Sequence, residues 1–170
     1  MSGATLVYDD GDVLARLNRL ASFDASSMLT DIGETLVSST TQRFVDGKGP
    51  DGSPWEPLAE STRLARVGGG KKSRKKDGSF RAGALRVLDN MKVLVDRGHL
   101  RDSITYQVGT DEVAVGSNKA YAAIHQFGGQ AGRGQAVTIP ARPFLGISAD
   151  DEREINLIAQ HHIANAIAGQ

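Results

Sequence analysis

The stretch of sequence that decides the fold is residues 117–147, which read SNKAYAAIHQFGGQAGRGQAVTIPARPFLGI. It combines a run with helical spacing, a glycine-rich break, a short apolar run and a Pro-Ala-Arg-Pro-Phe element. Glycine-rich breaks often bind phosphates where a helix begins, and a histidine in such a stretch can act in catalysis. The stretch is therefore either an active site or the joint of a structural part.

The spacing of apolar residues predicts a short helix over 119–127. Tyr121, Ile124 and Phe127 recur at intervals of three, which places them on one face, and we expect that face to pack on a sheet. Gly128 begins the glycine-rich break that ends the helix, and we expect the break to be a mobile loop.

A short strand is predicted over 136–139, and Pro140 ends it because proline donates no ladder hydrogen bond. Pro140 and Pro143 have fixed φ angles and restrict the residues before them, so we expect them to fix the approach of Phe144 to the final helix. Arg142 lies between the two prolines. Its planar guanidinium suits either a carbonyl or carboxylate of the same chain or a contact with another subunit.

The flanking segments predict a hairpin and a long helix. Residues 103–109 and 112–117 alternate apolar and polar side chains on either side of a Gly-Thr-Asp turn, which indicates a β-hairpin. Ser148 and Asp151 have capping-box spacing, which predicts the start of a C-terminal helix over about 149–168.

The N-terminal part, about residues 10–46, is predicted to be helical. A short amphipathic helix over 10–21 precedes a longer helix over 25–46, for which Asp24 is the expected N-cap. A segment rich in turn residues follows, and it contains the only tryptophan, Trp55. Trp55 is either an anchor that pins this loop to the body or an exposed hot spot for a partner.

The next segment is strongly basic. A short helix is predicted over 58–66, and a flexible basic arm over about 67–86, with three consecutive glycines inside it. The arm is either a solvated loop or a contact for phosphates or an acidic protein. It is not a phosphate-binding P-loop, because Ala65 occupies the position of the first required glycine. Its seven cations are Arg63, Arg66, Lys71, Lys72, Arg74, Lys75 and Lys76.

The composition limits the class of protein. The chain has 170 residues, which predicts a single domain over 1–170, and its 20 Lys and Arg equal its 20 Asp and Glu. A zero net charge argues against a dedicated nucleic-acid-binding protein. The absence of cysteine excludes disulfides, Cys-ligated zinc and a Cys nucleophile. Without an apolar run of about 20 residues or a signal-peptide pattern, we expect a soluble protein of the cytoplasmic side that contacts no membrane.

The order of the predicted elements defines an α+β fold. A small antiparallel β-sheet, from a β-rich body over about 90–147, is expected to pack against the N-terminal and C-terminal helices. The repeating strand–helix order of a nucleotide-binding fold is not present.

The sequence offers no catalytic, metal or cofactor constellation. His161 and His162 are adjacent, so they point to different faces of a helix and do not clamp one metal ion. The glycines of 128–135 follow a helix and precede a strand, which is the reverse of a dinucleotide fingerprint. His125 either packs and hydrogen-bonds or serves as the base of a hydrolase with a distant carboxylate.

Four motifs resemble, in their order, the phage virion morphogenesis family, also described as phage tail completion proteins. They read PDGSPWEP, LVDRGHLRDSI, VGSNKAYAAIHQFGG and IPARPFLG, and they lie between Pro50 and about Asp151. The resemblance implies that the motif residues are structural or interface positions. These are Trp55, Gly98, Leu100, Tyr121, His125, Phe127, Gly128, Pro140, Arg142, Pro143 and Phe144.

The resemblance implies a non-enzymatic, structural role in a tailed bacteriophage, in tail completion and head–tail joining at the neck. Such proteins are similar to ring-forming connectors, so we expect a homo-oligomeric ring, a hexamer, as a tail terminator or connector. It would assemble in the host cytoplasm and contact neighbouring neck and tail proteins, with DNA in the lumen as a further candidate partner. The alternative function is a small DNA-binding protein that uses residues 63–76. Under the family interpretation, residues 117–147 are a joint rather than an active site.

Overall fold

The computed structural model describes residues 11–68 and 73–169. Its helices are α1 (Gly11–Ala21), α2 (Ser26–Asp46), α3 (Glu60–Arg66), α4 (Ala82–Asp89), α5 (Ala122–Phe127) and α6 (Ala149–Ala168), with 3₁₀ turns η1 (Arg101–Ser103) and η2 (Arg133–Gln135). Its strands are β1 (Ile104–Val108), β2 (Val113–Ser117), β3 (Gly129–Ala131) and β4 (Val137–Ile139). The expected α+β class is confirmed.

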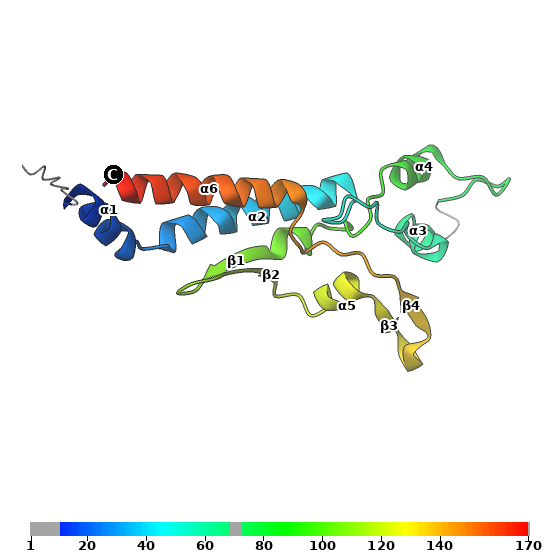
Figure 1. The fold of residues 1–170 in the computed structure, drawn as a ribbon. Helices are drawn as coiled ribbons and strands as arrows, with labels where there is room; N and C mark the ends of the chain where they lie inside the picture. Colours follow the sequence, from blue (N-terminus) through cyan, green and yellow to red (C-terminus); the bar gives the residue numbers. More distant parts are fainter. Residues whose placement is uncertain (1–10, 69–72, 170) are drawn as a thin grey trace, which may run out of the picture.

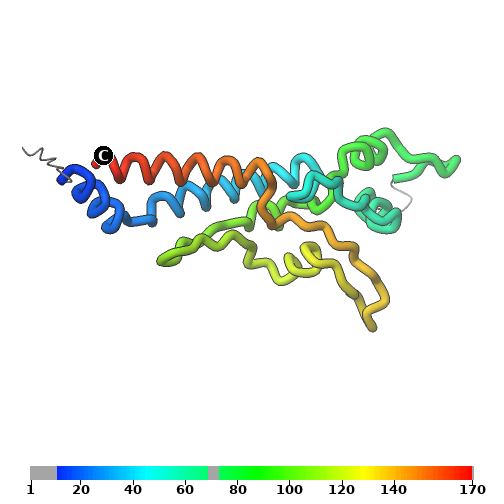
Figure 2. Tube along the Cα trace, in the orientation of Figure 1, coloured from blue at the N-terminus to red at the C-terminus, as the bar shows by residue number. Residues whose placement is uncertain are grey.

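The two long helices determine the shape of the molecule. Figure 1 shows α2 and α6 side by side, with α1 at one end of this pair and α3 and α4 at the other. The β1–β2 hairpin packs on α2, and the tube in Figure 2 shows the β3–β4 hairpin projecting from the body beyond α5. Within the described ranges, no helix is both long and apolar enough to cross a membrane.

The sheet consists of two separate antiparallel hairpins rather than one continuous layer. β1 and β2 pair with Ile104 opposite Ser117 and Val108 opposite Val113, as the alternating pattern predicts. Gly33 allows this hairpin to approach α2 closely, because a Cβ at this position would lie 2.5 Å from the ring of Tyr106.

The apolar core is small and aromatic. Phe44 of α2 and Phe144 are fully buried, and Trp55 is 6% exposed. The ring of Phe44 lies 5.4 Å from the ring of Trp55 and 5.4 Å from that of Phe144, which is within the range of favourable aromatic pairs. Leu100, Ile104 and Ala122 complete this cluster, so segments far apart in the sequence meet at one point.

A buried ion pair lies beside the aromatic core. Arg43 Nη2 is 2.5 Å from Asp151 Oδ2, and Arg43 Nη1 donates to the carbonyls of Phe144 and Gly146 at 2.8 and 2.9 Å. Asp151 also accepts from the N–H and hydroxyl of Ser148 at 2.7 Å, which completes the predicted capping box of α6. Arg43 therefore ties α2 to the start of α6 and to the segment that precedes it.

The end of α2 follows the sequence signal, but its start differs from expectation, because the N-cap is Ala25 rather than Asp24. Asp24 lies one residue earlier, and its Oδ1 accepts a hydrogen bond from the backbone N–H of Ser26 at 2.9 Å. Gly47 adopts a left-handed conformation with φ of 71° directly after the last helical residue.

The expected packing face of the short helix is wrong. Phe127 is 78% exposed and Tyr121 is 43% exposed, whereas Ala122 is buried in the core. The helix α5 has only six residues, and the small side chain of Ala122 lets its backbone come close to the aromatic core. The apolar spacing at 121, 124 and 127 therefore does not mark the buried face.

The glycine-rich break is not a loop without regular structure. Gly129 pairs with Ile139 and Ala131 with Val137, so β3 and β4 form a second hairpin around η2. Gly128, at φ of 73°, is required by close backbone approach, because a Cβ there would lie 2.8 Å from the nitrogen of Ala141.

Two segments before the β1–β2 hairpin contain local structure. Residues 92–95 form a tight turn, with Leu94 at φ of 60° and a bridge between Lys92 and Val95. The segment expected as a flexible arm over about 67–86 contains the first five residues of α4 and a bridge between Arg74 and Phe80.

We predict that Arg43→Met destabilises the protein by about 3–5 kcal/mol, because it leaves the carboxylate of Asp151 buried without its cation. Urea unfolding at pH 7 measures the loss, and Arg153→Met, at an exposed arginine of α6, is the matched control. A loss below about 1 kcal/mol would show that the pair does not hold the helices together.

The stability of the protein should also fall in acid because of Asp151. Burial alone would raise the pKa of Asp151, but hydrogen bonds from Ser39 and Ser148 and the charge of Arg43 outweigh burial and lower it. A carboxyl with a lowered folded-state pKa stabilises the fold above its unfolded pKa of about 3.9, and this stabilisation is lost as pH falls through the folded pKa. Asp151→Asn should therefore flatten the pH dependence of the urea midpoint below pH 5. Asp150→Asn, at an exposed neighbour, should leave the slope as in the unmodified protein.

Candidate functional site

A cleft of about 430 Å³ opens between α3, the loop before η1, α5 and β4. Apolar side chains such as Leu58, Leu94 and Ile139 supply much of its wall. Six of the residues singled out by the family motifs meet here, although they come from three separate motifs. We call it the motif cleft, after Gly98, Leu100, Tyr121, His125, Pro140 and Arg142.

The remaining motif residues lie outside the motif cleft. Trp55 is buried and donates from Nε1 to the carbonyl of Pro143 at 2.8 Å, so it anchors its loop to the body. Phe144 lies in the core, and Gly128 turns the chain into β3. Phe127 projects from the protein surface. The motifs therefore combine core positions, a cleft and one exposed aromatic residue.

Arg142 bonds within the chain. Its Nε donates to the carbonyl of Glu56 at 2.8 Å and its Nη2 to that of Pro57 at 2.9 Å. Its backbone N–H donates to the carbonyl of His125 at 2.7 Å. Of the two readings of Arg142, the intrachain carbonyl contact is the one that the structure contains. It joins the tryptophan loop, α5 and the segment after β4.

Gln126 is a positioning residue that the sequence analysis missed. Its Oε1 accepts from the N–H groups of Phe144 and Leu145 at 2.9 and 3.0 Å, and its Nε2 donates to the carbonyl of Leu145 at 3.0 Å. The side-chain amide of Gln126 therefore satisfies backbone donors and an acceptor that a neighbouring strand would otherwise satisfy. The sequence analysis also missed Arg43, because the spacing of apolar residues identifies the buried face of a helix but does not indicate that an arginine lies on that face.

The titratable side chains that line the motif cleft do not include a histidine paired with a carboxylate. Burial lowers the pKa of His125, and the positive charge of Arg142 lowers it further. Burial also lowers the pKa of Arg142, although Glu56 opposes this effect. Asp96 is the one carboxylate among the lining residues, and it pairs with Arg66 at 3.5 Å. No carboxylate lining the cleft is thus left to orient a catalytic imidazole.

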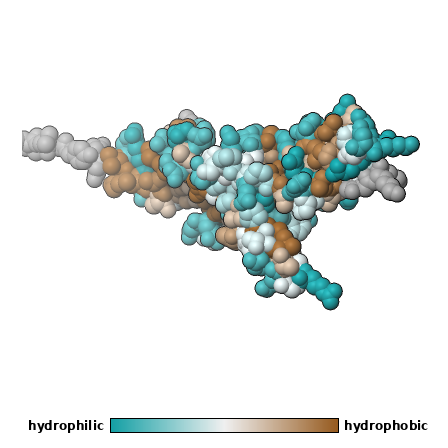
Figure 3. Space-filling view, turned by 90° about the vertical axis from the view of Figure 1, so that its right-hand side faces the viewer, coloured by the Kyte–Doolittle hydropathy of each residue, from teal (hydrophilic) through white to brown (hydrophobic). Residues whose placement is uncertain are grey.

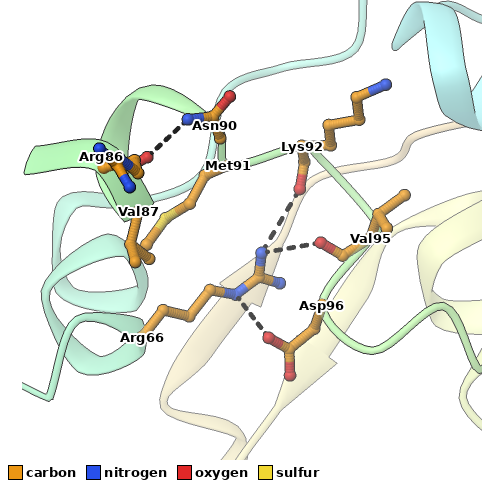
Figure 4. Close-up of a pocket in the computed structure, with 8 residues that line it drawn as sticks. All are labelled: Arg66, Arg86, Val87, Asn90, Met91, Lys92, Val95 and Asp96. Carbon is orange, nitrogen blue, oxygen red and sulfur yellow. Dashed lines mark hydrogen bonds and ion pairs between the residues drawn. The ribbon is translucent and has the colours of Figure 1, made fainter. Parts of the chain in front are cut away.

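Arg66 separates the motif cleft from a second cavity of about 500 Å³, which lies between α3 and α4. Figure 4 shows its side chain crossing towards the 92–96 turn. Nη1 donates to the carbonyls of Val95 and Lys92 at 3.2 and 3.4 Å. Arg66 therefore fixes the orientation of α3, which forms one wall of the motif cleft.

Of the seven predicted arm cations, the five that the structure describes do not share one set of contacts. Arg66 holds the turn described above, and Arg74 lies 4.3 Å from the ring of Phe80 and donates to the carbonyl of Gly78. Arg63 is exposed on α3, and Lys75 and Lys76 are exposed in the loop before α4. Lys71 and Lys72 lie outside the described residues.

One of the two adjacent histidines of α6 links this helix to α2. His162 Nε2 lies 2.7 Å from Asp31 Oδ2 and so links α6 to α2, whereas His161 is exposed. In the part of the chain that the structure describes, no group of three His, Asp or Glu side chains could hold a metal ion.

The chain belongs to the phage virion morphogenesis family, which it matches over residues 10–164. It is 35% identical over 122 residues to "Putative capsid assembly protein G" of Escherichia phage Mu, a match that covers 71% of this chain and 67% of that protein. It is 56% identical over 62 residues to "Mu-like prophage FluMu G protein 2" of Haemophilus influenzae, covering 36% of this chain and 45% of that relative. No solved structure matches.

The expected family is thus confirmed, and the protein is a structural protein of bacteriophage assembly. A more distant relative, "Mu-like prophage FluMu G protein 1" of Haemophilus influenzae, is 23% identical over 160 residues, which cover 92% of each chain.

We predict that Arg142→Lys destabilises the protein by about 1–3 kcal/mol, because a lysine does not reproduce the planar fork that reaches two carbonyls and leaves a part-buried acceptor unpaired. Urea unfolding measures the change. Arg133→Lys, at an exposed arginine of η2, is the control and should be nearly neutral. Equal midpoints for the two variants would contradict a structural role for the Arg142 bonds.

Proposed function

We propose that the chain is a ring-forming neck protein of a tailed bacteriophage, which acts in tail completion and head–tail joining as a tail terminator or connector. The observation that carries this proposal is the separation of roles among the motif residues. Arg142, Gln126 and Trp55 form hydrogen bonds within the chain that hold the segment around Pro143 in place. Tyr121 and Phe127, at the two ends of α5, remain exposed. Exposed aromatic side chains held by a rigid joint suit contact with other subunits.

The size of the core also supports assembly. Few of the side chains that the structure describes are fully buried, and Val137 and Ile147 are each more than half exposed. Burying apolar surface contributes about 25 cal/mol per Å². Contacts with copies or neighbouring virion proteins would therefore stabilise a modest domain by mass action.

The basic segment is assigned to a partner contact within this proposal. In a ring, Lys75 and Lys76 would meet either DNA phosphates in the lumen or an acidic face of an adjoining protein. DNA binding as the sole function has less support, because Arg66 and Arg74 are already engaged within the chain.

Deleting the gene from the phage that encodes this protein should leave separate filled heads and tails, which electron microscopy of lysates would reveal. Supplying the unmodified protein should restore joined particles. His125→Gln should restore them as well, because the function needs no catalytic base. Normal joined particles without the protein would overturn the proposed role, and failure of a folded His125→Gln protein would favour the hydrolase alternative.

A further inference from the structure

The motif cleft contains a buried cation without an anionic partner. Arg43 and Arg142 are the buried arginines among the described residues, at 7% and 6% exposure. Arg43 pairs with Asp151, whereas Arg142 forms no ion pair with any described carboxylate, and its Nη1 donates no hydrogen bond in that part of the chain. Leaving a buried charge unpaired is costly. Because Arg142 lines the motif cleft, a carboxylate bound there would supply the missing partner.

Other groups that line the cleft favour the same ligand chemistry. Nδ1 of His125 is the one buried side-chain nitrogen or oxygen atom among the described residues that has no hydrogen-bond partner. Arg66 and Arg97 line the cleft together with Arg142, and Asp96 is its one carboxylate. Three arginines against one aspartate leave an excess of two positive charges. The cleft therefore suits an anionic ligand.

One wall of the cleft is a strand that has a single neighbour. The three residues of β4 line the cleft, and among the described strands β4 pairs with β3 alone. An extended segment can add to the other edge of such a strand through main-chain hydrogen bonds, while its side chains enter the cleft. Leu58 and Leu94 contribute apolar surface. The ligand that fits is thus an extended, largely apolar segment that carries a carboxylate.

The N-terminal segment of this chain, residues 4–10, has this chemistry. It reads ATLVYDD and lies outside the described residues. A run with β-branched and aromatic side chains, which are enriched in strands, is followed directly by two aspartates. The other parts of the chain outside the described ranges, 69–72 and 170, contain no Asp or Glu. The N-terminal segment is therefore complementary to the cleft in both charge and strand-forming character.

The N-terminal segment cannot occupy the cleft of its own chain. It directly precedes α1, and Figure 1 places α1 and α3 at opposite ends of the α2–α6 pair. A helix of the length of α2, 21 residues, spans about 32 Å at 1.5 Å per residue. From Val7 to the start of α1, an extended chain covers at most about 14 Å. A contact between the N-terminal segment and the cleft is therefore a contact between copies.

Helix α1 would enlarge this contact. Val13, Leu14 and Leu17 are 46–55% exposed, and α1 has no buried residue. In the space-filling view of Figure 3, hydrophobic residues gather next to the N-terminal end of the molecule. Binding of the preceding residues in a cleft would bring this apolar face against the neighbouring copy.

We infer that residues 4–10 of one copy bind in the motif cleft of the next copy, as a strand beside β4 that places the Asp9–Asp10 pair next to Arg142. The inference rests on the proposed ring and identifies the contact that joins its subunits. The contact is head-to-tail, because different surfaces of the two copies meet. Such contacts close into a ring when the rotation between copies permits, and they otherwise extend as a filament.

Crosslinking of the full chain tests the contact directly, because the chain contains no cysteine. Val7→Cys and Thr138→Cys place thiols on the two sides of the contact, and a short bismaleimide crosslinker tolerates a shift of register between the strands. Thr138 is exposed, so the fold should persist. The matched control combines Val7→Cys with Leu157→Cys, at an exposed leucine of α6. Denaturing electrophoresis should show a ladder of dimers, trimers and larger products for the first protein and little product for the control.

A charge-neutralising variant tests the role of the two aspartates. Asp9→Asn with Asp10→Asn should require about tenfold higher concentration than the unmodified protein to associate, which corresponds to about 1.4 kcal/mol per contact. Asparagine is as favourable as aspartate before a helix, so the start of α1 should persist. Asp111→Asn with Glu112→Gln removes the same charge from the exposed β1–β2 turn and should associate like the unmodified protein. Sedimentation velocity over a range of concentrations measures the association.

Three results would overturn the inference. These are crosslinking no greater than in the control, equal association of the two charge variants, and an unmodified protein that stays monomeric throughout. A crosslink from position 138 to a different virion protein, in particles rather than in purified protein, would assign the cleft to that protein and likewise reject the N-terminal segment. The gene-deletion experiment does not depend on these measurements, so the head–tail role can stand when this contact fails.

Discussion

The buried ion pair between Arg43 and Asp151 holds the three segments on which the rest of the fold depends. Removing two charges from water is costly, and the cost is offset here because Arg43 also donates to two carbonyls and Asp151 also accepts from the α6 cap. These bonds are directional, so they fix how α2 and α6 lie along each other. The aromatic cluster around Phe44 then fills the space that this arrangement leaves.

Local signals in the sequence were sufficient for the elements that depend on neighbouring residues. The β1–β2 hairpin, the capping box at Ser148 and the end of α2 before Gly47 all follow from short patterns. Contacts between distant segments were not predictable in this way. The role of Arg43 depends on Asp151, which is 108 positions away, and no periodicity marks such a pair. The exposed position of Phe127 has the same origin, because the core accepts Ala122 instead.

The sequence predicted which residues belong to the candidate site, but it did not predict that they line one cleft. The family motifs identified six residues of the motif cleft, yet they come from different segments and meet only through the fold. Spacing also gave no sign that Gln126 would bond to the backbone of the Phe144 segment. The reason is physical: a side-chain amide is compatible with many surroundings, and only the path of the facing chain decides its role.

The bonds that hold the segment from Pro143 to Gly146 have one property in common. Trp55, Gln126 and Arg43 all reach main-chain atoms of this segment rather than its side chains. These hydrogen bonds therefore depend on the course of the backbone, and they do not depend directly on which side chains the segment carries. Leu145, which is only partly buried, can be exchanged for another apolar residue at little cost, whereas Phe144 is fixed by its burial in the core and each of the holding side chains by its donors and acceptors. Evolution of the surface beyond this joint can thus proceed without redesign of the joint itself.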